Sequence, residues 1–261
     1  MILDEIAAKR KIQLEREKTV FPQDAAERAA KAAPLPKDFR GALKQKEKQH
    51  LSVIAEIKRS SPSKGIICGN FDPVRTAHAY ANAGVDAVSV LTEEAYFGGS
   101  SGVLKQVRAA VSLPILRKDF VLDPYQIFEA RAIGADAILL IAALLEDNAL
   151  REFKKLADSL GLSYLMEAHN EEELDRVLRA GASLVGINNR DLKTFRVDLN
   201  TTARLAKRVP SDCVLVSESG VVSASDMKAA QQAGAHAVLI GETLMRSKDP
   251  TQTLRELRNM A

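Results

Sequence analysis

Residues 133–141 read IGADAILLI. A glycine ends a helical stretch there and is followed by a small residue, a polar residue and then an apolar run. The same phrase recurs as AGVDAVSV at 83–90, AGASLVGI at 180–187 and AGAHAVLI at 233–240. Each glycine suits a left-handed helix cap, after which the chain turns into a β-strand. Strands that alternate with helices in this way are predicted to pair in parallel, through right-handed crossovers.

The other apolar runs, interpreted in the same way, bring the number of expected strands to eight. A (β/α)₈ barrel uses about 250 residues, or roughly 31 per unit, so the slightly shorter region from Val53 onward predicts short loops. A doubly wound open sheet is the alternative, but that fold usually has a glycine-rich turn after its first strand, and KRSSP at 58–62 is no such turn. The expected fold class is therefore α/β, a single TIM barrel. The expected strands are 53–58, 87–92, 114–119, 137–142, 163–168, 184–189, 214–219 and 237–241.

The first part of the chain stands outside the repeat. We expect one domain over 1–261, with an N-terminal helical extension at 1–48 and the barrel at 49–261. Residues 2–18 are predicted to form a charged amphipathic helix, followed by an Ala-rich stretch and the sequence PLP at 34–36. A mobile tail is the alternative, but the helix has an apolar stripe worth burying. The stripe consists of Ile2, Leu3, Ile6 and Ile12.

Composition excludes several classes of function. The 261 residues carry a net charge of only +3, and basic residues alternate with acidic ones, so no nucleic-acid partner is expected. Cys68 and Cys213 lack the spacing of a metal site or a disulfide framework, which favours a reducing, cytoplasmic location. Residues 1–10 lack the apolar core of a signal peptide or membrane span. Nothing indicates a large exposed apolar helix face, so we expect a monomer with no membrane partner.

Charged side chains stand at the carboxyl ends of several expected strands, where barrels of this class place their catalytic groups. The period of two along a strand puts Glu56 and Lys58 on the same side as Ile54. One such residue alone is often a solvated rim residue or half of a structural ion pair. Several charged side chains at one end of the barrel cost desolvation energy, which proteins seldom accept unless the charges form ion pairs or have a function. Ion pairing also makes their pKa values adjustable, as acid and base catalysis requires. The five are Glu56, Lys58, Lys118, Glu167 and Glu218.

Two turns predict a phosphate site. SESG at 217–220 precedes a helix after the seventh strand, and LIGE at 239–242 precedes another after the eighth. Backbone N–H groups at such helix starts bind anions, and Ser61 and Arg190 could add side-chain donors. Either glycine alone is explained by a tight turn, but the pair at this end of the barrel favours a phosphorylated ligand.

The sequence motifs resemble those of indole-3-glycerol-phosphate synthases. IAEIKRSSPS at 54–63 is similar to that family's first-strand motif, A-E-x-K-R-x-S-P-S. The resemblance extends from residue 51 to the end, and the N-terminal helix is similar too. The further motifs follow in the family order and are VLTEEAYFGGS at 90–100, LRKDF at 116–120, EAH at 167–169, GINNRDL at 186–192, SESG at 217–220 and LIGE at 239–242.

This resemblance implies a reaction on 1-(2-carboxyphenylamino)-1-deoxyribulose 5-phosphate, with loss of carbon dioxide and water and with no cofactor or metal. It implies that Lys118 is the general acid on the ketone oxygen and that Glu167 is the general base for later proton removal. Lys58 would assist and neutralise the substrate carboxylate. Glu56 would hold the lysines in place, while Asn188 and Glu218 would position the substrate and stabilise developing charge.

The resemblance also assigns the two ends of the substrate. Mobility of the loop at 59–69 is expected to close the mouth. The phosphate-facing residues would be Ser61, Arg190, Ser219, Gly220 and Gly241, and the aromatic slot would be lined by Phe97, Phe120, Leu139 and Ile240.

Two residues depart from the simple pattern. Glu242 puts a carboxylate beside the expected phosphate, where some relatives have Ser, so its side chain is expected to point away. His169 follows the implied base and suggests a metal ligand or relay. With only four histidines and no second one at ligand spacing, we expect a loop or supporting residue instead.

Two other functions remain possible from sequence, because a fold alone does not define an activity. A phosphoribosyl sugar isomerase, or another phosphate-binding barrel, would share the phosphate site. It would not need the combination of Lys58, Lys118 and Glu167. A barrel that only binds a ligand or a protein would be expected to lack one of these three, and all three are present.

Overall fold

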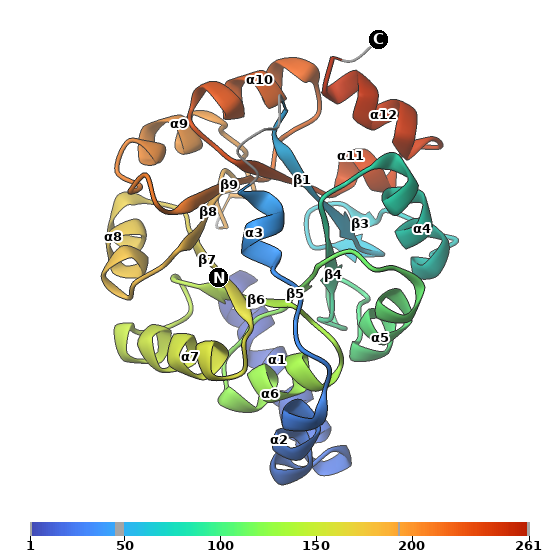
Figure 1. The fold of residues 1–261 in the computed structure, drawn as a ribbon, viewed down its shortest axis with the longest axis vertical. Helices are drawn as coiled ribbons and strands as arrows, with labels where there is room; N and C mark the ends of the chain where they lie inside the picture. The colour runs from blue at the N-terminus through green and yellow to red at the C-terminus, as the bar shows by residue number, and fades with distance from the viewer. Residues whose placement is uncertain (1, 45–49, 193, 260–261) are drawn as a thin grey trace.

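A closed barrel of parallel strands forms the centre of the molecule in the computed structural model, which describes residues 2–44, 50–192 and 194–259. The strand order around the ring is β1-β10-β9-β8-β7-β6-β5-β4 (Figure 1). This confirms the predicted (β/α)₈ barrel and excludes the open sheet. The strands agree with the expected ranges to within one residue at each end. They are β1 (Ser52–Ile57), β4 (Ala87–Leu91), β5 (Ile115–Lys118), β6 (Ala137–Ile141), β7 (Ser163–Ala168), β8 (Leu184–Asn188), β9 (Val214–Glu218) and β10 (Ala237–Ile240).

Helices cover the outside of the barrel (Figure 1). Several of them begin behind a side-chain cap, such as Asp72, Asp123 and Asp249, and carry proline in the first turn, where its missing N–H costs nothing. The surrounding helices are α4 (Pro73–Ala83), α5 (Ser101–Ala110), α6 (Pro124–Ala132), α7 (Asp147–Ser159), α8 (Glu171–Arg179), α9 (Asn200–Ala206), α10 (Ala224–Gln232), α11 (Glu242–Met245) and α12 (Pro250–Leu257).

The recurring phrase in the sequence has a clear structural role. Its four glycines all have φ between 78° and 92°, in the left-handed region where glycine is favoured, so each ends a helix as predicted. The polar residue two positions later often holds the start of a neighbouring strand. Asp86 accepts a hydrogen bond from Val53 N, and Asp136 accepts one from Ile115 N. The glycines are Gly84, Gly134, Gly181 and Gly234.

Alternate strand residues point into the barrel, as the period of two requires. The lower layers of this interior are apolar, and they include Ile54 of β1, Leu116 of β5 and Leu165 of β7, all fully buried. The opposite faces of the strands pack under the helices in a second, larger apolar core. The apolar interior leaves only the carboxyl ends of the strands for polar groups.

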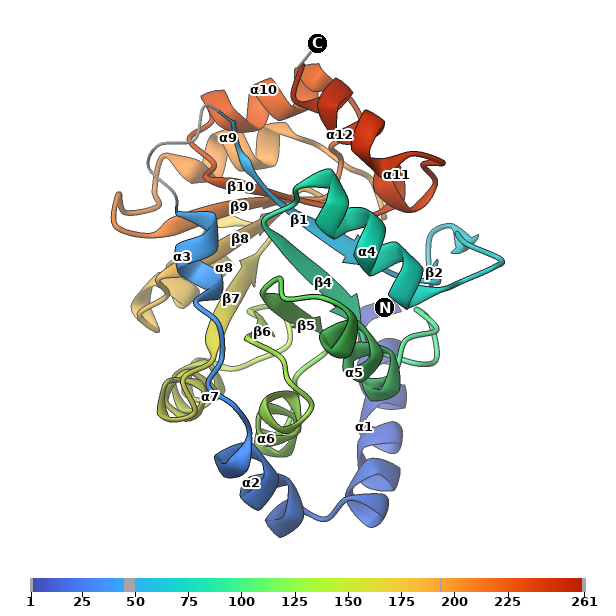
Figure 2. The same cartoon turned by 45° about the vertical axis from the view of Figure 1, so that its right-hand side comes forward.

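The N-terminal segment runs from one end of the barrel to the other. It forms α1 (Ile2–Val20), α2 (Gln23–Ala32) and α3 (Phe39–Leu43), which confirms a helical extension packed on the barrel. Figure 2 shows α1 beside the carboxyl ends of the strands and α3 at the opposite end. Phe39 and Leu43 of α3 are buried among the interior side chains of the barrel. The expected boundary between extension and barrel, at residues 48 and 49, lies outside the described residues.

The expected apolar stripe of α1 is partly wrong. Leu3 and Ile6 are buried, but Ile12 is 57% exposed, and the buried positions further along the helix are Arg10 and Leu14. The physical reason is that Arg10 forms a buried ion pair with Asp119, which fixes the rotation of the helix about its axis and turns Ile12 to solvent.

The loop after β1 contains a short hairpin that the sequence did not predict, formed by β2 (Ser60–Ser61) and β3 (Gly65–Ile66). Ser60 attaches it to the loop after β4, since its N–H and hydroxyl donate to the carbonyls of Phe97 and Tyr96. Among the described residues, no helix is long and apolar enough to cross a membrane.

Candidate active site

A cavity of about 610 Å³ opens at the carboxyl ends of the strands. It contains every residue that the sequence analysis assigned to catalysis or to substrate binding. The catalytic set is Glu56, Lys58, Lys118, Glu167, Asn188 and Glu218, and the substrate-binding set is Ser61, Phe97, Phe120, Leu139, Arg190, Ser219, Gly220, Ile240 and Gly241.

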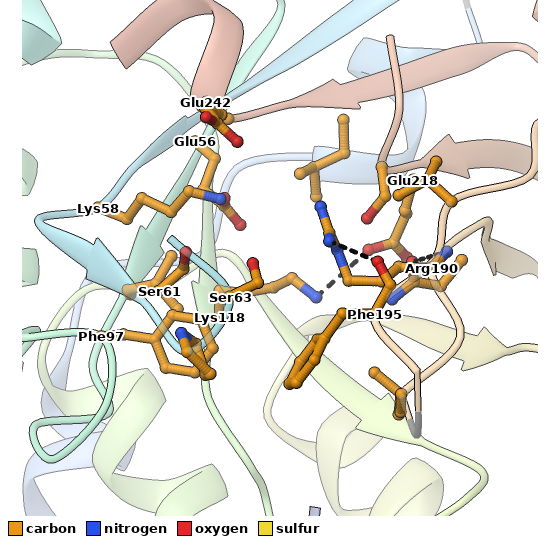
Figure 3. A pocket seen from close by; sticks show the side chains of 18 of the residues that line it. Glu56, Lys58, Ser61, Ser63, Phe97, Lys118, Arg190, Phe195, Glu218 and Glu242 are labelled. Carbon is orange, nitrogen blue, oxygen red and sulfur yellow. Dashed lines mark hydrogen bonds and ion pairs between the residues drawn. The ribbon is translucent and has the colours of Figure 1, made fainter. Parts of the chain in front are cut away.

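Lys118, the last residue of β5, projects into this cavity (Figure 3). Its Nζ lies 2.9 Å from Glu167 Oε2 of β7 and 3.3 Å from Glu218 Oε2 of β9. Both carboxylates are almost fully buried, with side chains 3% and 2% exposed. Each of the three stands at an inward position of its strand, so the alternation of the strands produces the cluster.

The charges in this cluster control one another's protonation. Burial alone would lower the pKa of Lys118, but the surrounding carboxylates of Glu167 and Glu218 outweigh it and raise that pKa well above its usual range. Burial would raise the pKa of Glu167, yet the charges of Lys118 and His169 lower it well below the ordinary value. Lys118 is therefore a proton donor at neutral pH, and Glu167 is an ionised proton acceptor.

Glu218 has the opposite character. Burial and the neighbouring Glu167 carboxylate raise the pKa of Glu218 to about 8, against the attraction of Lys118. Two carboxyl groups beside one ammonium group thus divide into one ionised and one protonated member, which is the usual outcome for buried like charges. Among the described residues, Glu218 Oε1 has no hydrogen-bond partner and is buried against Gly186, where a Cβ would leave it no room.

A second ion pair lies on the other side of the cavity (Figure 3). It joins Glu56 of β1 to Lys58, which directly follows that strand. Gly241 leaves the space for it, since a Cβ there would lie 2.7 Å from Lys58 Nζ and even closer to Glu56 Oε2. The role of Glu56 implied by the resemblance, to hold both lysines, involves direct contact only with Lys58; on Lys118 Glu56 acts through its charge, which helps to raise the pKa of that lysine. Glu56 pairs with Lys58, whereas Lys118 pairs with Glu167 and Glu218.

Two further side chains contact the carboxylate of Glu167. Asn188 Nδ2 of β8 donates to Glu167 Oε1 at 3.3 Å, and its own Oδ1 accepts from Arg190 N. His169, in the bend after β7, places Nε2 at 3.2 Å from the same oxygen. The expectation that His169 is a loop residue in a supporting position agrees with this arrangement.

The expected phosphate residues surround one part of the mouth. Ser219 and Gly220 after β9 have φ of 67° and 96°, and this turn brings their backbone to the cavity. Arg190 follows the neighbouring strand β8 and donates from Nη1 to the Phe195 carbonyl of its own loop. Glu242 turns its carboxylate back to Arg246 at 2.9 Å, as required if only its backbone is to face an anion.

One wall of the cavity is apolar. The predicted residues Phe97 and Phe120 form a tilted ring pair there, with centroids 6.1 Å apart. Other side chains of this wall were missed by the sequence analysis. Leu3 and Ile6 of α1 also line the cavity, as does Phe195 from the loop after β8. The apolar stripe of α1 predicts that Leu3 and Ile6 are buried, but it does not indicate which surface covers them. Phe195 lies in a polar loop that has no apolar pattern.

A metal site needs several ligands at one place. Within 2–44, 50–192 and 194–259, no group of three or more His, Cys, Asp or Glu side chains has an arrangement that would hold a metal ion. The chemistry available from the described side chains is a lysine acid and a carboxylate base, with hydrogen-bond donors for an anion at the rim.

The whole chain is similar to known proteins. A family model described as indole-3-glycerol phosphate synthase matches residues 3–257. The indole-3-glycerol phosphate synthase of Ruminiclostridium cellulolyticum is 50% identical over 265 residues, covering 100% of both chains. That of Acetivibrio thermocellus is 47% identical over 260 residues, covering 99% of each.

Solved structures with lower identity show the same fold. A 3-hexulose-6-phosphate synthase superposes with a TM-score of 0.64 at 19% identity, covering 81% of this chain and 100% of the other. Thiamine phosphate pyrophosphorylase from Pyrococcus furiosus gives 0.60 at 16% identity, covering 80% and 94%. At these identities the likeness concerns the barrel alone.

Proposed function

Because the chain belongs to the indole-3-glycerol phosphate synthase family, we propose that the cluster around Lys118 is its catalytic centre. The protein is a carboxy-lyase of tryptophan biosynthesis. It converts 1-(2-carboxyphenylamino)-1-deoxyribulose 5-phosphate to indole-3-glycerol phosphate, carbon dioxide and water. The observation that carries the assignment is the contact of Lys118 Nζ with both Glu167 and Glu218 inside a cavity that also has an apolar wall.

Ring closure is the first step. The aromatic carbon that bears the carboxylate forms a bond to the ketone carbon, and Lys118 donates a proton to the ketone oxygen, which becomes a hydroxyl group. The carbon–carbon bond to the carboxylate then breaks, carbon dioxide leaves, and its bonding electrons restore the aromatic ring. A lysine suits this acid role because its flexible stem follows the oxygen as the carbon changes geometry.

Dehydration completes the indole. Glu167 removes a proton from the new five-membered ring, and the hydroxyl group takes a proton from a lysine and leaves as water. The ionised state of Glu167 supports this base role, since Lys118 and His169 lower its pKa. Lys58 faces the cavity from the other side, where its charge suits the substrate carboxylate, and Glu56 holds it there.

Orientation comes from the two ends of the substrate. The rings of Phe97 and Phe120, with Leu139 and Ile240, suit the aromatic ring, and the turns at Ser219 and Gly241 suit the phosphate. Ser61, Arg190 and Gly220 would complete the phosphate contacts. Asn188 and Glu218 stand between these ends and would position the sugar.

The test is turnover in EDTA, followed by indole fluorescence, for the wild type, Lys118→Ala and a control, Lys105→Ala. Lys105 is exposed on α5, away from the cavity. We expect Lys118→Ala to lose at least 10²-fold in kcat, the usual contribution of a general acid, while Lys105→Ala keeps full activity. Equal activity of all three proteins would reject the assignment of Lys118.

For the assembly we propose one domain that acts as a monomer in the cytoplasm. The large exposed apolar side chains are scattered over separate elements, such as Val20, Leu35 and Val222, and both cysteines are free thiols. Light scattering behind a sizing column should give the chain mass of 28.4 kDa, and unfolding should follow a single transition. A mass of twice this value would reject the monomer.

A further inference from the structure

His169 lies between two carboxylates, behind the proposed catalytic base. Its Nε2 is 3.2 Å from Glu167 Oε1, and its Nδ1 is 2.9 Å from Glu173 Oε2. The side chain is only 11% exposed, and the residue lies outside the set that lines the cavity. The imidazole therefore connects the base to α8 and has no direct access to the substrate.

The start of α8 fixes this imidazole. Glu173 accepts hydrogen bonds from His169 N and Nδ1 with one oxygen, and from Asn170 Nδ2 with the other. Asn170 in turn caps the helix by accepting from Glu173 N at 2.9 Å. The helix cap and the histidine are thus one hydrogen-bonded unit, in which the side chains of Glu173 and Asn170 hold the imidazole at the first turn of α8.

The surroundings favour a positive charge on this ring. A neutral imidazole has one nitrogen that accepts, but here both nitrogens face carboxylate oxygens, which only a doubly protonated ring satisfies. Burial opposes the charge, yet Glu167 and Glu173 outweigh it and raise the pKa of His169 to about 10. Among the described residues, Nε2 has no well-directed hydrogen bond, so its contact with Glu167 acts mainly through charge.

The other charged groups nearby are engaged elsewhere. Lys118 of β5 and Glu218 of β9 meet each other and Glu167 on the cavity side. On the outer side of α8, Arg208 pairs with Glu171 and Asp175. Arg176 of α8 pairs with Asp147. The charge at His169 is therefore set by its two carboxylate neighbours.

We propose that His169 is a positioning residue for the base, a permanent imidazolium that holds Glu167 Oε1 and leaves Oε2 free to face Lys118 and the reacting carbon. This inference rests on the proposed role of Glu167. The cation keeps Glu167 ionised beside the protonated Glu218 through its charge, and Asn188, which donates to the same Oε1, fixes the plane of the carboxylate. A buried base next to a second carboxyl group would otherwise share its proton.

The charge is tested by the ¹⁵N resonances of the imidazoles, followed by NMR against pH in wild type, His169→Gln and Glu173→Gln. The pair of resonances absent from His169→Gln is expected to show the imidazolium form at pH 8. In Glu173→Gln the same pair should titrate at lower pH, because one stabilising carboxylate is lost. A neutral ring at pH 8 in the wild type would overturn the proposal.

The effect on the base is tested by the pH dependence of kcat in His169→Gln and His169→Ala, with His78→Gln, exposed on α4, as the control. Without the cation the pKa of Glu167 rises, so the acid limb of kcat should move to higher pH in both variants. The pH-independent value of kcat should fall about 10-fold in His169→Ala. It should fall less in His169→Gln, because the amide of Gln can donate a hydrogen bond to Glu167. KM should stay within about twofold of the wild-type value in both variants. Profiles that superimpose on the wild type would contradict positioning.

A separate variant distinguishes this proposal from the function on which it rests. Glu167→Gln should remove catalysis whatever the state of His169. If Glu167→Gln stays fully active, the assignment of Glu167 fails, and the role of His169 in catalysis fails with it. If Glu167→Gln is inactive while both His169 variants keep wild-type profiles, only the inference about His169 is overturned.

Discussion

Arg10 of α1 donates two hydrogen bonds to Asp119, the residue after Lys118, over 2.8 Å from Nε to Oδ1 and 2.9 Å from Nη2 to Oδ2. Both side chains are fully buried. Asp119 also accepts from Arg117 and from the hydroxyl of Thr92. The N-terminal helix is thus tied by charge to the strand end that carries the proposed acid.

Loss of this ion pair should be costly. Arg10→Met keeps much of the side-chain stem but leaves Asp119 with less compensation, and we expect the free energy of unfolding to fall by about 3 kcal/mol. KM should rise as well, because Leu3 and Ile6 of the same helix line the cavity. The exposed Lys11→Ala serves as control and should change stability by less than about 0.5 kcal/mol. Equal denaturant midpoints for the two variants would contradict this.

The proton on Glu218 should be visible in the infrared. Since burial and Glu167 raise the pKa of Glu218 to about 8, the carboxyl group is protonated below that pH and ionises as the pH rises through it. The difference spectrum of wild type minus Glu218→Gln should show a carboxylic C=O stretch at pH 6 that disappears by pH 10. The same subtraction with Asp147→Asn, whose pKa is lowered by the hydrogen bond from Arg176, should show none. An ionised Glu218 at pH 6 would refute the assignment.

Gly241 should be intolerant of a side chain. In Gly241→Ala the new Cβ would displace Lys58 and Glu56, and misplacement of catalytic groups by about 1 Å costs on the order of 10²-fold in rate. We expect kcat/KM to fall by this amount with little change in the melting temperature. Gly102→Ala on α5 is the matched control, because its Cβ would meet only Ser100 Oγ, at an ordinary 3.5 Å. Normal kinetics in Gly241→Ala would show that the pair moves without penalty.

Closure of the loop at 59–69 remains a prediction. Backbone amides of this loop should exchange hydrogen more slowly when a phosphorylated substrate analogue is bound, because Ser61 and Lys58 at its start would contact the ligand. Helix α7, on the outside of the barrel, should show the same exchange with and without the analogue. Unchanged exchange at 59–69 under saturating analogue would exclude closure.

Local patterns account for what the sequence predicted well. The repeat, which ends four of the helices at a glycine, predicts the strands, and the period of two along the first strand places Glu56 and Lys58 on the same side as Ile54. The barrel then determines that strand ends meet at one mouth. Residues at strand ends, such as Lys118 and Glu167, could therefore be brought to that mouth from the sequence, whereas the role of Asn188 came from the resemblance to the family.

Pairings between distant segments could not be predicted. Arg10 looks like a surface residue of a charged helix until Asp119, 109 positions later, is brought beside it. The partners of Lys118 depend on which side chains reach it across the barrel, which no spacing along one strand reveals. His169 was noticed, but its contact with Glu173 depends on where α8 begins.

The path of the N-terminal segment has a consequence for synthesis. Arg40 of α3 donates to the carbonyl of Asp212, a partner 172 residues further along the chain, and Lys37 N donates to Asp136. At about 5 to 20 residues per second, the ribosome needs roughly 10 to 30 seconds to supply those 172 residues. Helix α3 therefore cannot complete its contacts until the strands near the end of the barrel have been made, whereas the partners of α1 and α2, Asp119 and α6, are available much earlier.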